Sequence, residues 1–206
     1  MVYHAGGGGG APAARPPPPA APPPRGGGAP PGTTTLREAD HLIRDLASTL
    51  ALPPGTVACT HLIRTDARRG TAVSLEFPDR ESATTAWRHL TESEPPQGDR
   101  EAAAQAAADH TARRSGRAVL FPGAEHLTGT VTVADVLERT AIDRVLVVGA
   151  TAGEPPAPAT PVHTQDHVRP EWRDGELVLA LVPAVGNALA PFEVPNPTPC
   201  CSDHTN

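Results

Sequence analysis

The chain has 206 residues, with 17 basic and 23 acidic side chains and a formal net charge of -6. All of the basic residues are arginine, which excludes lysine-dependent chemistry such as a Schiff base or a P-loop lysine. The acidic balance argues against a nucleic-acid partner, because phosphate binding requires clustered cations. We expect a cytoplasmic protein with no membrane partner, since no stretch approaches the roughly 20 apolar residues of a membrane span and no signal peptide is apparent.

Residues 1–33 differ from the rest of the chain in composition. They contain 10 Pro, 9 Gly and 7 Ala, and therefore almost no branched or aromatic surface that folding could bury. We predict a disordered tail, in which the proline run at 16–24 favours polyproline II and is typical of a spacer.

The segment 34–92 is predicted to form an αββα subdomain. Thr35 and Glu38 form a capping box ahead of an apolar stripe at helical spacing. Two segments rich in β-formers, 57–64 and 71–77, follow, with the sequence between them suited to a hairpin turn. A second helix begins after Asp79. This order resembles part of a ferredoxin-like split βαβ unit that is one edge strand short.

The remaining segments complete an α+β prediction. Residues 93–116 form an alanine-rich helical linker, and residues 117–195 form a small βαβ unit followed by an antiparallel β-meander. The meander is indicated by two turn signals, Asp174-Gly175 and Gly186-Asn187. Residues 196–206 form a proline- and cysteine-containing C-terminal tail.

The C-terminal tail carries the densest group of ligand-type residues, Cys200, Cys201 and His204. Thiolate and imidazole ligands favour zinc or Cu(I), so these residues are candidates for a metal site. Adjacent cysteines are awkward chelators of one tetrahedral ion, and a metal here would need ligands from elsewhere in the chain. The alternatives are a redox-active vicinal disulfide, an exposed, oxidisable terminus with no assigned role, and a terminus packed against the sheet by its prolines.

Cys59 and His61 lie two residues apart on a predicted strand and therefore share one face. They are a second candidate metal-ligand pair, although a buried cysteine and a hydrogen-bonded histidine are commoner. The hairpin register decides their surroundings. Thr60 lies opposite Leu75 in one register, whereas His61 lies opposite Leu75 when the strands slip by one residue.

Glu125 and His126 are the candidate acid/base pair if the protein is an enzyme. They lie in a predicted loop between a strand and a helix, and such loops often carry sites in α/β units.

Three segments stand out near the C-terminus: Val168-Arg-Pro-Glu-Trp172, Pro191-Phe-Glu-Val-Pro and Thr198-Pro-Cys-Cys-Ser-Asp-His204. Through them the last third of the chain resembles uncharacterised small proteins of GC-rich actinobacteria. The resemblance implies no activity and no site residues.

The sequence therefore favours a binding or accessory protein, in its sharpest form a thiol-dependent metal or redox module with zinc or copper. The alternatives are a small enzyme that uses Glu125 and His126, and a protein–protein adaptor with a proline-rich spacer.

Overall fold

The computed structural model describes residues 2–5, 35–64, 69–93, 100–149 and 155–195. The chain divides into two compact units, residues 1–112 and 113–206, and each is described by itself. Helices and strands occur in both units, which confirms the predicted α+β class. Within the described ranges, no helix is both long and apolar enough to cross a membrane.

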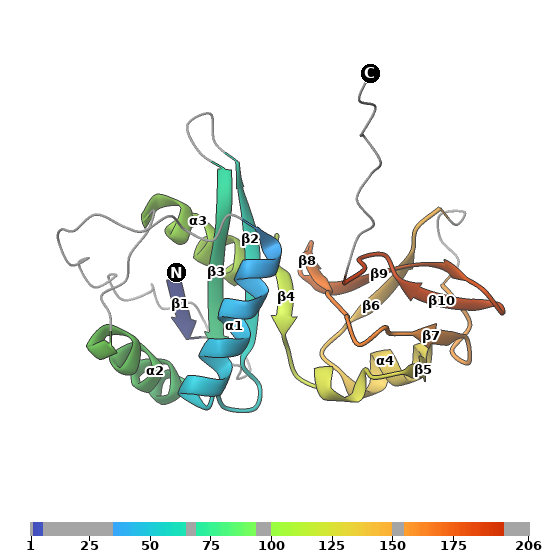
Figure 1. The fold of residues 1–206 in the computed structure, drawn as a ribbon, viewed down its shortest axis with the longest axis horizontal. Coiled ribbons are helices and arrows are strands. Elements are labelled where there is room, and N and C mark those ends of the chain that lie inside the picture. The colour runs from blue at the N-terminus through green and yellow to red at the C-terminus, as the bar shows by residue number, and fades with distance from the viewer. Residues whose placement is uncertain (1, 6–34, 65–68, 94–99, 150–154, 196–206) are drawn as a thin grey trace, which may run out of the picture. The chain divides into compact units, whose positions relative to one another are not determined.

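The first unit is built on a sheet in which helices pack on both faces (Figure 1). Its elements are β1 (Val2–Ala5), α1 (Leu36–Leu50), β2 (Val57–Arg64), β3 (Arg69–Phe77), α2 (Arg80–Ser93) and α3 (Arg100–Thr111). The strand order is β1-β3-β2, with β3 antiparallel to β2 and parallel to β1. The predicted order of helix, strand, strand and helix is confirmed by α1, β2, β3 and α2.

Strand β1 falls inside the segment predicted to be disordered. It pairs with β3 from Val2 opposite Ser74 to Ala5 opposite Phe77, so the prediction is wrong for these residues. Residues 6–33 of the predicted tail lie outside the described residues. Because β1 is parallel to β3, it runs antiparallel to β2, whereas a βαβ unit joins two parallel strands. The connection from β1 through α1 to β2 is therefore not a βαβ unit.

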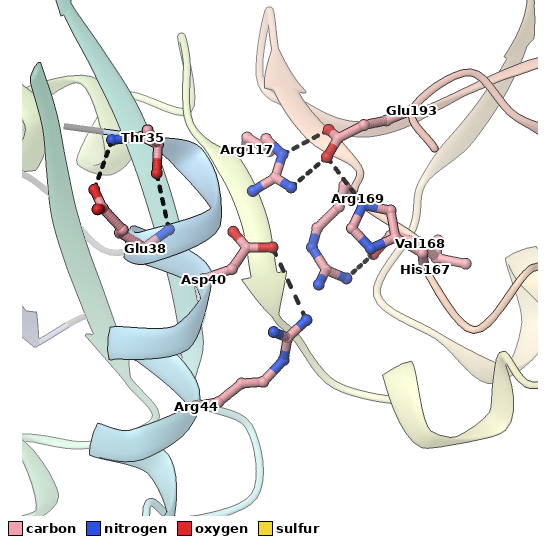
Figure 2. Close-up of polar contacts among 9 residues, drawn as sticks. All are labelled: Thr35, Glu38, Asp40, Arg44, Arg117, His167, Val168, Arg169 and Glu193. Atoms are coloured by element: carbon pink, nitrogen blue, oxygen red, sulfur yellow. Dashed lines mark hydrogen bonds and ion pairs between the residues drawn. The ribbon is translucent and has the colours of Figure 1, made fainter. Parts of the chain in front are cut away.

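The capping box predicted at the start of α1 is present. Thr35 Oγ1 accepts a hydrogen bond from the Glu38 amide at 3.2 Å, and Glu38 Oε2 accepts one from the Thr35 amide at 3.0 Å (Figure 2). Two orphan amides of the first turn are therefore paired. The helix ends where Ala51 adopts a left-handed conformation, two residues before Pro53.

The β2–β3 hairpin has neither of the two registers considered from the sequence. Val57 lies opposite Glu76 and Arg64 opposite Arg69, so Thr60 pairs with Val73 and not with Leu75. Both earlier registers are wrong because β3 begins at Arg69, inside the segment assigned to the turn. The observed register places Cys59 opposite Ser74.

Helix α3 belongs to the first unit, although its segment was expected to be a linker. It contacts β3, β1 and β2. In Figure 1, α1 crosses in front of β2 and β3, and α3 lies behind them. Ser74 and Glu76 therefore face α3, while Leu75 and Phe77 alternate with them and point to the opposite face.

The second unit is a curved mixed sheet with one α-helix and one short 3₁₀ helix among its described residues. Its elements are β4 (Arg117–Leu120), η1 (Ala124–His126), β5 (Thr130–Thr132), α4 (Val133–Arg139), β6 (Arg144–Val147), β7 (Pro161–His163), β8 (Glu171–Arg173), β9 (Glu176–Ala184) and β10 (Ala188–Pro191). The order is β4-β8-β9-β10-β7-β5, and β6 pairs with β9.

Strand β9 is the centre of the second unit because β8, β10 and β6 all pair with it. Both predicted hairpins form. Asp174 and Gly175 have the positive φ angles of the β8–β9 turn, and Gly186 and Asn187 those of the β9–β10 turn. Strands β4 and β6 run in the same direction, but β8 and β9 lie between them, so they are not the neighbours that a compact βαβ crossover would join.

Each unit has its own apolar core. In the first unit Ile43 of α1 and Leu75 and Phe77 of β3 are fully buried. In the second unit the fully buried side chains come mainly from β9 and the elements around it, namely Leu177, Leu179, Leu181, Val136, Ile142 and Val162.

Candidate functional site

The first unit holds a chain of buried polar side chains between β2, β3 and α3. His61 of β2, Ser74 and Glu76 of β3, and His110 of α3 lie on the same side of the sheet. The hairpin register brings the strand residues together, because residues 57, 59 and 61 of β2 face residues 76, 74 and 72 of β3. His110 reaches the strands from the face of α3 that also buries Ala103 and Ala106.

The contacts run continuously from His61 to Glu76. His61 Nε2 lies 2.8 Å from Ser74 Oγ, and Ser74 Oγ lies 2.7 Å from His110 Nδ1. On the other side of the ring, His110 Nε2 lies 3.2 Å from Glu76 Oε2. Ser74 is completely buried and His110 is 1 % exposed, whereas the Glu76 side chain is 21 % exposed. This series of hydrogen-bonded side chains therefore begins in the interior and reaches solvent at the carboxylate of Glu76.

When both imidazoles are neutral, donor and acceptor chemistry gives this series of hydrogen bonds one direction. A carboxylate can only accept, so His110 Nε2 carries the proton that points to Glu76. With a neutral His110 ring, Nδ1 then accepts the hydroxyl proton of Ser74. Ser74 Oγ in turn accepts from the Nε2–H of His61. With both imidazoles neutral, each of these contacts has one donor and one acceptor.

Burial favours the neutral state of His61. The pKa of His61 is lowered from 6.5 to about 4, mainly by loss of solvation and also by the nearby His110, while Asp109 opposes the shift. His61 is therefore uncharged at neutral pH.

Cys59 adjoins the same chain. Its Sγ lies 4.0 Å from His110 Nε2, and the residue is completely buried. A thiol that is buried in this way is chemically inert, because only an accessible thiolate is a good nucleophile or metal ligand. The structure places Cys59 and His61 as a buried cysteine and a hydrogen-bonded histidine. Among the described residues, no group of three or more His, Cys, Asp or Glu side chains is arranged to hold a metal ion.

Sequence reasoning missed Ser74, Glu76 and His110, although each left a signal. Ser74 and Glu76 alternate with the apolar Leu75 and Phe77, so β3 has one polar face that needs partners. His110 continues the stripe of Ala103 and Ala106 at helical spacing and is the polar member of that stripe.

The predicted acid/base pair has a different setting. Glu125 and His126 lie in η1, with side chains that are 72 % and 42 % exposed. His126 Nε2 is 3.7 Å from Glu125 Oε1, which is longer than a hydrogen bond, and His126 Nδ1 lies 3.2 Å from Arg139 Nη2. Because a guanidinium can only donate, Nδ1 accepts from Arg139 and is occupied as a base.

The second unit contains a polar cluster that the sequence did not indicate (Figure 2). Arg117, at the start of β4, is only 7 % exposed. Its Nε donates to Glu193 Oε2 at 2.6 Å, and its Nη2 donates to Glu193 Oε1. His167 Nε2 lies 3.0 Å from the same Oε1.

Glu193 stays ionised in this cluster. Burial acts to raise the pKa of Glu193, but the hydrogen bonds and charges of Arg117 and His167 outweigh it, so the pKa is lowered. A bidentate arginine–carboxylate pair of this kind fixes geometry more than it offers chemistry, because the carboxylate is already neutralised. We interpret it as a structural tie between β4 and the segment that follows β10.

The remaining predicted ligands, Cys200, Cys201 and His204, lie outside the described residues. Comparison with known proteins adds no further constraint: no family model matches the chain, and neither the curated proteins nor the solved structures include a match.

Proposed function

We propose that this chain is a binding or accessory protein and not an enzyme. The observation that carries the proposal is the burial of its best acid/base arrangement. Glu76, His110 and Ser74 have the order of a carboxylate–imidazole–hydroxyl relay, but the hydroxyl that would act as nucleophile is completely buried under α3. A substrate cannot reach Ser74 in this conformation.

The accessible candidates support the same conclusion. Glu125 and His126 are exposed and do not hydrogen bond to each other. One ring nitrogen of His126 accepts a hydrogen bond from Arg139. General acid–base catalysis needs a positioned group that can exchange a proton with the substrate, and an exposed pair that makes no hydrogen bond with each other is poorly suited to it.

Labelling with a fluorophosphonate tests this proposal, because such probes react with activated serine nucleophiles. We expect no labelling of Ser74 in the native protein, with the Ser74→Ala variant giving the same background. Stoichiometric labelling that is lost in Ser74→Ala would contradict the proposal and would identify Glu76, His110 and Ser74 as a catalytic relay.

The specific ligand that we propose is a soft metal ion, zinc or Cu(I), held through Cys200, Cys201 and His204. Its support is the chemistry of the residue types, since thiolate and imidazole prefer these ions. The test is metal analysis of the full chain purified under reducing conditions. We expect bound zinc or copper in the wild type and its loss in Cys200→Ser/Cys201→Ser.

Cys59→Ala is the matched control for that experiment. It removes a thiol that is buried beside His110, so metal content should not change. Absence of metal from the wild type contradicts the metal assignment, and retention of metal by the double variant assigns it to other ligands.

A further inference from the structure

The packing face of α3 consists of small side chains and one histidine. Ala103, Ala106 and His110 are its buried residues, and the two alanines each contribute a single methyl group. By contrast, α1 buries the much larger Ile43 against the other face of the same sheet. Hydrophobic stabilisation scales with the apolar area removed from water, so α3 gains little of it.

The largest buried side chain of α3 is therefore a polar one. His110 contacts three groups of the sheet: Ser74 Oγ at 2.7 Å, Glu76 Oε2 at 3.2 Å and Cys59 Sγ at 4.0 Å. These contacts connect α3 to both strands of the hairpin. Through these contacts His110 ties α3 to the sheet.

Breaking these contacts together costs little free energy. If α3 moves away intact, water can replace the hydrogen bonds of Ser74, Glu76 and His110, because both partners become solvated together. The apolar surface that would be exposed on α3 is limited to the alanine face. Segments with few buried apolar contacts open locally at a free energy well below that of global unfolding.

We propose that α3 is a detachable cover of the sheet, held by His110, and that its release exposes Cys59, His61 and Ser74 while α1 and the β2–β3 hairpin stay folded. The opened face would present a thiol, an imidazole and a hydroxyl side by side. In the closed state His61 contacts Ser74, and His110 contacts Ser74, Cys59 and Glu76.

Alkylation of Cys59 under native conditions at neutral pH tests this proposal. The full chain carries Cys200→Ser/Cys201→Ser, so that Cys59 is the remaining thiol, and iodoacetamide labelling is followed by mass spectrometry across low urea concentrations. We expect Cys59 to react faster than the protein unfolds globally. The rate should depend only weakly on urea, because local opening exposes little surface.

His110→Ala should raise the labelling rate by about tenfold or more. The reason is that loss of its hydrogen bonds shifts the equilibrium between closed and open α3 by about a factor of ten. His41→Ala is the matched control: this histidine is exposed on α1, and its removal should leave the rate unchanged. Amide hydrogen exchange should show the same pattern, with faster exchange in α3 than in α1, β2 and β3.

The Cys200→Ser/Cys201→Ser protein with His110 intact can overturn the proposal by itself, even if His110→Ala does not fold. The proposal fails if Cys59 is labelled only at the rate of global unfolding, with its full urea dependence. It also fails if the amides of α3 and α1 exchange with the same free energy, because α3 would then belong to the same cooperative unit as the rest of the sheet.

Discussion

At the scale of single residues, His61 makes the stability of the first unit depend on pH. Its pKa is about 4 in the folded protein and 6.5 in an unfolded chain, so acid protonates the unfolded state first. The stabilisation is complete above pH 6.5 and is lost as the pH falls from 6.5 to 4. The difference between the two pKa values corresponds to a change of about 3 kcal/mol in the free energy of unfolding.

We therefore expect the free energy of unfolding of the first unit to fall by about 2 kcal/mol more between pH 7 and pH 4.5 in the wild type than in His61→Gln. Glutamine retains a side-chain N–H that can donate to Ser74 but does not titrate. Urea unfolding at the two pH values measures the difference. The exposed His41→Gln serves as the control and should keep the wild-type pH dependence; an equal dependence in His61→Gln would refute the assignment.

Glu193 gives a second prediction at this scale. Glu193→Ala removes the acceptor of two hydrogen bonds from the buried Arg117 and should destabilise the second unit by about 2 kcal/mol. Glu176→Ala is the matched control, because Glu176 pairs with Arg144 and both side chains are half exposed. That variant should cost less than about 1 kcal/mol. Equal effects in urea unfolding would show that burial of Arg117 is unimportant.

At the scale of elements, Gly123 joins η1 to α4 by a close backbone approach. Its φ is +81°, and a Cβ placed there would lie 2.1 Å from the carbonyl oxygen of Arg139 and 2.6 Å from the Cα of Thr140. Neither backbone atom can move without displacing the end of α4. Glycine is thus required at this position both by conformation and by space.

Gly123→Ala should destabilise the second unit by clearly more than Gly129→Ala. Gly129 also has a positive φ, +63°, but a Cβ there meets nothing within 4 Å, so alanine should cost only the conformational penalty of about 1 kcal/mol. Thermal or urea unfolding of the two variants measures the difference. Similar losses would mean that the chain around Gly123 relaxes without cost.

At the scale of the whole molecule, the two units have separate cores, and acid should affect them differently. Hydrogen exchange at pH 5 and pH 7, corrected for the intrinsic pH effect, should show a larger loss of protection in β2, β3 and α3 than in β9 and β10. His61→Gln should remove the excess loss in the first unit. The same loss in both units would instead show one cooperative structure.

Local signals in the sequence predicted many of the elements. The capping box at Thr35, the helix after Asp79 and the turn at Asp174-Gly175 are all encoded within a few residues, and the structure confirms each of them. Such features depend on hydrogen bonds and backbone conformations that neighbouring residues provide.

Pairings between distant segments were not predictable in the same way. Val2–Ala5 contains β-formers, but the Gly/Pro/Ala-rich composition of the flanking residues favoured a prediction of disorder. Pairing with β3 makes this segment a strand. The hairpin register likewise depends on where β3 begins, and local propensity did not distinguish a strand from a turn at Arg69 and Gly70.

The candidate site shows the same division. The sequence by itself determined the α+β class, the order of most helices and strands, and the shared face of Cys59 and His61, because each follows from the local period of the chain. Only the tertiary structure decided that this face is covered by α3 and that His61, Ser74, His110 and Glu76 form one chain. His110 is 36 residues from Ser74, and hydrogen bonds between positions so far apart exist only after the helix has packed on the sheet.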